Sequence, residues 1–165
     1  MNKRGFVQDS FYITAMLFLG ALGIVLAFFI YGNLNQAFID TPGLPSEPIE
    51  DFTSGYERFP TVWDYGFLFI LVVVYMSVMI LSYLLPTNPA FYVIVIFILM
   101  AMMLVAGFLS NAWFEIMTDT PLGISADNFP IMSFIINNYV MFVLLLGFLS
   151  AMAFYAKSQT QGGFQ

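Results

Sequence analysis

Carboxylates are the most numerous charged groups in this chain, which has ten acidic and four basic residues among 165. It has no histidine and no cysteine. These absences remove the usual zinc and haem ligands, thiol chemistry, disulfides and every histidine-based acid–base or nucleophile arrangement. The net charge of −6 leaves no basic surface for phosphate backbones, so we expect no direct nucleic-acid partner.

One cluster of acids, Glu47, Glu50 and Asp51, is the best candidate for a cation or catalytic site. It lacks the alternating oxygen ligands and the glycine of an EF-hand loop. Acidic pairs in a proline-rich segment usually form a solvated face. The chain also has no P-loop, dinucleotide fingerprint or serine elbow. We therefore expect no enzyme, with no catalytic residue, cofactor or metal.

The composition is that of an integral membrane protein: 61% of residues are hydrophobic, 8% are charged and the mean hydropathy is +0.89. Charged residues are absent from 10–39, 65–114 and 128–156. The middle stretch is long enough for two spans, and Pro86-Thr87-Asn88-Pro89 breaks it. The sequence predicts an all-α protein, a single membrane domain over residues 1–165. Its four transmembrane helices form two hairpins, with spans at about 11–31, 64–85, 90–113 and 132–155.

Two acidic, proline-rich outer loops, 33–63 and 114–131, would then join the spans of each hairpin. Lys3, Arg4 and Lys157 share one side, so the positive-inside rule predicts cytoplasmic termini. We expect the aromatic residues of the first loop to lie at the bilayer interface or against the second loop. The predicted interface anchors of the spans are Trp63, Trp113, Tyr83, Tyr92 and Tyr155.

The tripeptide Asp-Thr-Pro occurs once in each outer loop, as Asp40-Thr41-Pro42 and as Asp119-Thr120-Pro121. Each copy lies 28 or 29 residues beyond an aromatic pair, Phe11-Tyr12 or Phe91-Tyr92. One interpretation is a duplicated hairpin with parallel repeats. The other is ordinary chemistry at a helix boundary, where Thr and Pro are common. Both copies are candidate loop contacts.

A transporter or proton relay would need an ionisable residue within a span, and no predicted span has one away from its ends. Asn111, Asn137 and Asn138 could line a small polar vestibule or form hydrogen bonds between helices. Small residues four apart favour close helix approach, within the bundle or between copies. The predicted packing residues are Gly23, Ala27, Ala106, Ser110, Gly147 and Ala151.

The opening segment Met1–Asp9, with a long span directly after it, resembles small membrane proteins of tailless, membrane-containing icosahedral viruses of bacteria and archaea. The inner turn Thr87-Asn88-Pro89, with aromatics after it, is similar too. The resemblance implies a component of the virion's internal membrane that links membrane and capsid.

We therefore expect a non-enzymatic structural protein in a virion internal membrane or host cell membrane. Its partners would be the lipid bilayer and other membrane or capsid subunits, in an oligomer or larger assembly. Two alternatives remain open. One is an accessory subunit of a cellular multisubunit membrane complex, and the other is a holin-like pore former, which would need a polar helix face.

Overall fold

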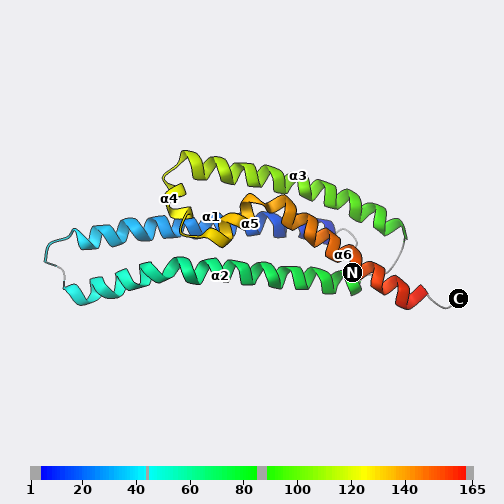
Figure 1. Ribbon diagram of the computed structural model, residues 1–165, viewed down its shortest axis with the longest axis horizontal. Helices are drawn as coiled ribbons and strands as arrows, with labels where there is room; N and C mark the ends of the chain where they lie inside the picture. Colours follow the sequence, from blue (N-terminus) through cyan, green and yellow to red (C-terminus); the bar gives the residue numbers. More distant parts are fainter. Residues whose placement is uncertain (1–4, 44, 85–88, 163–165) are drawn as a thin grey trace.

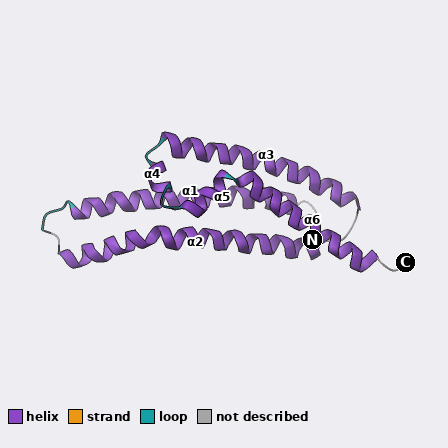
Figure 2. Cartoon of the chain, viewed as in Figure 1, coloured by secondary structure: helices purple, strands orange, loops and turns teal. Residues whose placement is uncertain are grey.

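The structure is a computed structural model that describes the backbone of residues 5–43, 45–84 and 89–162, and the side chains of 12–43, 45–84, 96–153 and 155–157. This part of the chain is helical and contains no strand (Figure 2). The helices are α1 (Gly5–Ile39), α2 (Ser46–Leu84), α3 (Pro89–Asp119), α4 (Leu122–Ala126), α5 (Pro130–Asn137) and α6 (Tyr139–Gly162). Four segments are long and apolar enough to cross a membrane, as predicted: Tyr12–Ile39, Ser46–Leu84, Ile96–Asp119 and Tyr139–Lys157.

The first half of the chain is one long helical hairpin of α1 and α2 (Figure 1). The predicted outer loop at 33–63 is wrong, because only residues 40–45 connect the two helices. Pro48 lies in the first turn of α2, where a missing N–H breaks no helical hydrogen bond. Gly43 makes the turn with a φ of 91°, a conformation that glycine adopts without strain.

The second half is shorter and more broken. The predicted loop at 114–131 is wrong in its bounds, because α3 continues to Asp119, the short α4 lies within the remaining segment and α5 begins at Pro130. The predicted fourth span at 132–155 is two helices, α5 and α6, interrupted at Asn138. The backbone of Asn138, with φ −107° and ψ 28°, has left the helical region.

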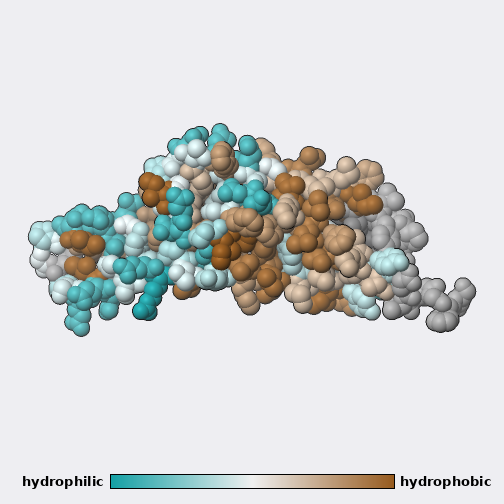
Figure 3. Space-filling model, viewed as in Figure 1, coloured by the Kyte–Doolittle hydropathy of each residue, from teal (hydrophilic) through white to brown (hydrophobic). Residues whose placement is uncertain are grey.

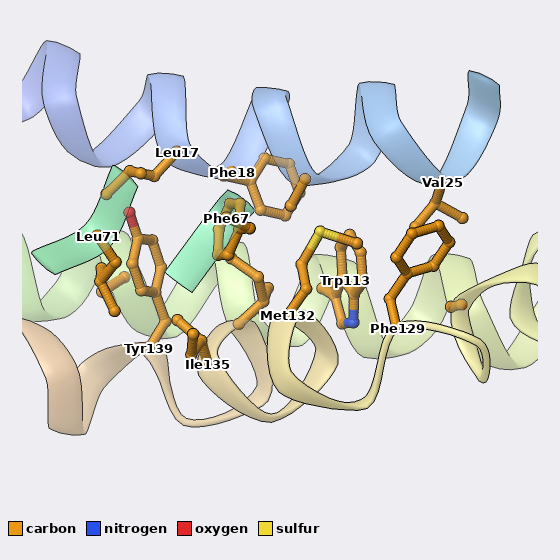
Figure 4. Close-up of a cluster of buried hydrophobic side chains, with 14 of the residues drawn as sticks. Leu17, Phe18, Val25, Phe67, Leu71, Trp113, Phe129, Met132, Ile135 and Tyr139 are labelled. Atoms are coloured by element: carbon orange, nitrogen blue, oxygen red, sulfur yellow. The ribbon is translucent and has the colours of Figure 1, made fainter. Parts of the chain in front are cut away.

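The long helices form a closed ring: α1 packs on α2, α2 on α6, α6 on α3, and α3 on α1. The core lies where α4 and α5 cover this ring, and Figure 4 shows side chains from both halves of the chain meeting there. Trp113 and Phe18 pack edge to face with ring centroids 6.3 Å apart. Phe129 and Met132 are fully buried beside them.

Many large apolar side chains point outward instead. Leu104 is 78% exposed, Phe108 75% and Phe69 68%. A water-soluble bundle would bury these residues, whereas lipid accepts them. Figure 3 shows the division along the molecule: one end of the α1–α2 hairpin is largely hydrophilic, and the surface toward the opposite end is mostly hydrophobic.

Candidate functional site

The part of the α1–α2 hairpin that extends past Asp64 is the candidate site. Phe28 lies against Phe59, with ring centroids 5.7 Å apart, so Asp64 stands opposite residues 23–24 of α1. We call residues 25–63 the projecting hairpin. The uncharged run of α2 begins at residue 65, and its 20 residues to Leu84 are about 30 Å long, the thickness of a bilayer's hydrocarbon. Ser46 therefore stands about 27 Å beyond Asp64 on the same helix.

A ladder of aromatic rings holds the two arms of the projecting hairpin together. Phe28 stacks on Tyr56 with centroids 4.7 Å apart and an interplanar angle of 2°. Tyr31 meets Phe52 edge to face at 4.5 Å, and its hydroxyl donates a hydrogen bond to the Phe52 carbonyl oxygen. Such pairs contribute about 0.5–1.5 kcal/mol each beyond area burial, so they help to hold the two arms together as one rod.

The second half of the chain supports the base of this rod. Phe129, which is fully buried, packs edge to face on Phe28 with centroids 5.3 Å apart. Phe59 lies 6.4 Å from the same Phe129 ring. The expectation that aromatics of the first outer segment meet the second is therefore correct at Phe59, whereas Phe52 and Tyr56 pack on α1 instead.

Asp64 joins α2 to α5. Its carboxylate is only 4% exposed and accepts backbone N–H bonds from Ile131, at 3.0 Å, and from Met132, at 2.7 Å. Phe129, the N-cap residue of α5, supplies no side-chain cap. The carboxylate of α2 therefore caps the first turn of α5, where the N–H groups carry partial positive charge. The sequence placed Asp64 at the membrane boundary but did not reveal this contact.

The two Asp-Thr-Pro copies end α1 and α3 in the same way. Thr41 Oγ1 donates to the Ala37 carbonyl at 2.7 Å, and Thr120 Oγ1 donates to that of Ile116. Gln36 adds hydrogen bonds to the Asp40 carboxylate. The next element differs between the copies, because a 39-residue helix comes after the first and the short α4 after the second. The shared structure is thus that of a helix end.

The surface of the projecting hairpin carries acids and apolar side chains together. Leu26, Ile30 and Leu34 recur every four residues along α1 and are each about half exposed. Near the turn, Phe38 and Ile39 are 41% and 50% exposed. Figure 3 shows hydrophobic residues among hydrophilic ones at this end. The charged residues around them are all exposed: Asp40, Glu47, Glu50, Asp51, Glu57 and Arg58.

This combination of apolar and acidic side chains has the chemistry of a surface suited to contact with a protein. Among the described residues, no group of three or more acids is placed to hold a metal ion. The acids Glu47, Glu50 and Asp51 are exposed to solvent. An exposed apolar stripe with mostly acidic residues around it is typical of an interaction surface.

The predicted interface anchors are only partly at the surface. Trp63, Tyr83 and Tyr155 are 43%, 49% and 63% exposed. Trp113 is 1% exposed, so the prediction that it anchors in headgroups is wrong; its ring fills the core against Phe18 because it faces the bundle axis. The side chain of Tyr92 lies outside the described residues.

The predicted packing residues also divide. Ala106 is fully buried, and Ser110 Oγ donates to the Asn137 carbonyl at 2.8 Å, so both lie where α3 meets other helices. Gly147 lies directly against Leu99 of α3, whereas Ala151 is exposed. A Cβ on Gly23 would meet nothing within 4 Å, and Ala27 on the same helix is exposed.

Comparison of the chain with protein-family models, curated proteins and solved structures finds no match. The functional argument therefore depends on the geometry of the chain itself.

Proposed function

We propose that the chain is a non-enzymatic structural protein of a membrane, and that the projecting hairpin is the element by which it binds its neighbours in an assembly. The observation that supports this is continuity. α1 and α2 run unbroken from the apolar bundle into the projecting hairpin, and Asp64 fastens α2 to α5 where they leave it. A partner held at the tip is therefore joined to the bundle by two continuous helices, as an anchor requires.

The chemistry of the partner follows from the charges of the hairpin. With Asp40, Glu47, Glu50, Asp51 and Glu57 against Arg58, the hairpin repels anions. Its partner is a protein surface with basic residues around an apolar patch, and not a nucleic acid. Each exposed ion pair contributes little, so the affinity comes mainly from burying the apolar side chains of α1.

The setting we propose is the internal membrane of a virion, supported by the resemblance of Met1–Asp9 and the inner turn to virion membrane proteins. Lys3, Arg4 and Lys157 favour cytoplasmic termini and a projecting hairpin on the opposite side. In a virion membrane that forms by inward pinching, the termini then face the capsid. The partner of the hairpin is another protein subunit on the inner side.

The orientation is measured with single cysteines, since the chain has none. Ser46 and Ser54 are exposed on the projecting hairpin and report its side, whereas Ser125 is buried and is unsuitable. Membrane-impermeant reagent added to intact cells should label Ser46→Cys and Ser54→Cys. Labelling only after the cells are opened would place the hairpin in the cytoplasm.

The assembly function is tested by reversing charge on the hairpin. The test is a triple variant that combines Glu47→Lys, Glu50→Lys and Asp51→Lys. This variant should insert into the membrane normally, but its incorporation into the purified particle or complex should fall at least about tenfold. The reason is that like charges facing each other at an interface cost several kcal/mol of binding free energy. The matched control reverses three exposed acids elsewhere, Glu115, Asp119 and Asp127.

The control should be incorporated normally, which separates surface recognition from net charge. Equal incorporation of the hairpin variant and wild type would refute the proposal. Capsid and packaging proteins in the purified assembly support the virion setting. Respiratory or secretory subunits there would instead make the chain an accessory subunit of a cellular complex.

A further inference from the structure

Two asparagines lie on the outer surface of the membrane-spanning bundle. Asn111 of α3 and Asn137, the last residue of α5, are both exposed. They are close in space, because Ser110 Oγ, one residue from Asn111, donates to the Asn137 carbonyl at 2.8 Å. Neither asparagine side chain has a hydrogen-bond partner among the described residues. A vestibule inside the bundle, one of the two sequence interpretations, does not fit this outward placement.

Their surroundings are apolar and exposed. Phe108 and Leu104 precede Asn111 on α3 and are 75% and 78% exposed, and Phe134 beside Asn137 is 58% exposed. Figure 3 shows a hydrophilic patch in this part of the surface, next to hydrophobic residues, near the junction of α5 and α6. We call the surface of Leu104, Phe108, Asn111, Phe134 and Asn137 the amide face.

The depth of the amide face follows from Asp64. Asn137 is six helical residues beyond Ile131, whose N–H binds the Asp64 carboxylate, and so lies about 9 Å deeper. Asn111 is at a similar depth because of the Ser110 contact. An amide without a partner in hydrocarbon costs up to several kcal/mol, whereas pairing between helices removes that cost.

We propose that the amide face is the contact between two copies of this chain, related by a two-fold axis along the membrane normal. Such an axis places residues of equal depth opposite one another. An amide both donates and accepts hydrogen bonds, so it is complementary to itself. Asn111 and Asn137 of one copy thus meet the same two residues of the other, while the apolar side chains around them pack.

A second copy satisfies these amides with no further requirement, and that is why we choose it over an unrelated helix. An unrelated helix would need its own polar residue at the same depth. The proposal is independent of the projecting hairpin, since α3 is not part of that element, and the dimer can form whether or not the hairpin binds a partner.

Cysteine cross-linking of the full chain in native membranes tests the contact. Asn111→Cys should form a disulfide-linked dimer on mild oxidation. The control is Phe69→Cys on α2, which is not adjacent to α3 in the helix ring. Phe69 is 68% exposed, and it lies about 8 Å deeper than Asp64, a depth similar to that of the amide face. Cross-linking at Asn111 that does not exceed that at Phe69 would overturn the proposal.

Association measured in liposomes by single-molecule photobleaching gives a second result. Wild type should be dimeric, and Asn111→Ala with Asn137→Ala should associate about tenfold more weakly. Ser77→Ala, which removes an exposed hydroxyl that bonds only within α2, should not change association. A monomeric wild type, or a double variant that associates as tightly as wild type, contradicts the proposal.

Discussion

Replacing Asp64 with alanine removes the contact that joins α2 to α5. The carboxylate is 4% exposed and accepts two backbone N–H bonds, so the substitution leaves the N–H groups of Ile131 and Met132 without their acceptor. Pro130 has no N–H of its own, and Phe129 offers no side-chain cap. Within α5 there is no replacement for the lost acceptor.

The magnitude follows from the two bonds. Hydrogen bonds to a charged group contribute about 1.5–3 kcal/mol each, and leaving a buried donor without a partner costs about 1–3 kcal/mol. Water reaching the opened turn would recover part of this. We expect Asp64→Ala to lower the free energy of unfolding by about 3–5 kcal/mol. Asp64→Asn should cost less, because its amide oxygen can still accept one bond.

The loss of unfolding free energy is measured by reversible unfolding in mixed micelles, with the fluorescence of Trp63 and Trp113 as the signal. Hydrogen exchange at the amides of Ile131 and Met132 gives its location and should accelerate in the variant. Asp51→Ala, which removes an exposed acid of the same helix, serves as the control and should change stability by less than about 0.5 kcal/mol. Equal stability and equal exchange in Asp64→Ala and wild type would refute the capping role.

Three further substitutions test the packing, each by unfolding in micelles. Phe28→Ala should lower the free energy of unfolding by about 3–5 kcal/mol, because this buried ring joins both arms of the projecting hairpin to the second half of the chain. Gly123→Ala should lower the free energy of unfolding by about 1–3 kcal/mol, since the new Cβ would overlap a backbone carbonyl near the end of α3. Its control, Gly20→Ala, has open space around the new Cβ and should not destabilise the chain. Gly147→Leu should destabilise the isolated chain by about 1–3 kcal/mol through overlap with a leucine of α3, while Gly23→Leu should leave it folded. A destabilising Gly23→Leu would show that its face is covered within one chain.

The sequence predicted the number of helices long and apolar enough to span a membrane, because the positions of charged residues depend on the solvent and not on tertiary packing. It failed at the projecting hairpin. Prolines near residue 45 indicated a loop, although Pro48 occupies a position that the start of a helix tolerates. A contrary signal was present: Phe52, Tyr56 and Phe59 are spaced four and three apart, as on one helical face.

The contacts at the base of the hairpin could not be read from the sequence in the same way. Asp64 and Ile131 are 67 residues apart, and no local pattern links an acid to a distant helix start. The inward direction of Trp113 depends on how α3 is rotated, which its apolar, nearly featureless sequence does not determine. Helices in lipid are apolar on all sides, so periodicity does not distinguish the core from the surface.

The proposed function requires that residues 46–63 form a continuous helix standing in water. The most direct measurement is the distance between spin labels at Ser46→Cys and Thr61→Cys, both exposed on α2, in the full chain in liposomes. The helical rise between these two positions predicts a narrow distribution of distances at about 22 Å, with the label at residue 46 freely accessible to a water-soluble quencher. A broad distribution, or a label at residue 46 shielded by lipid, would show a loop lying on the bilayer and contradict the projecting hairpin.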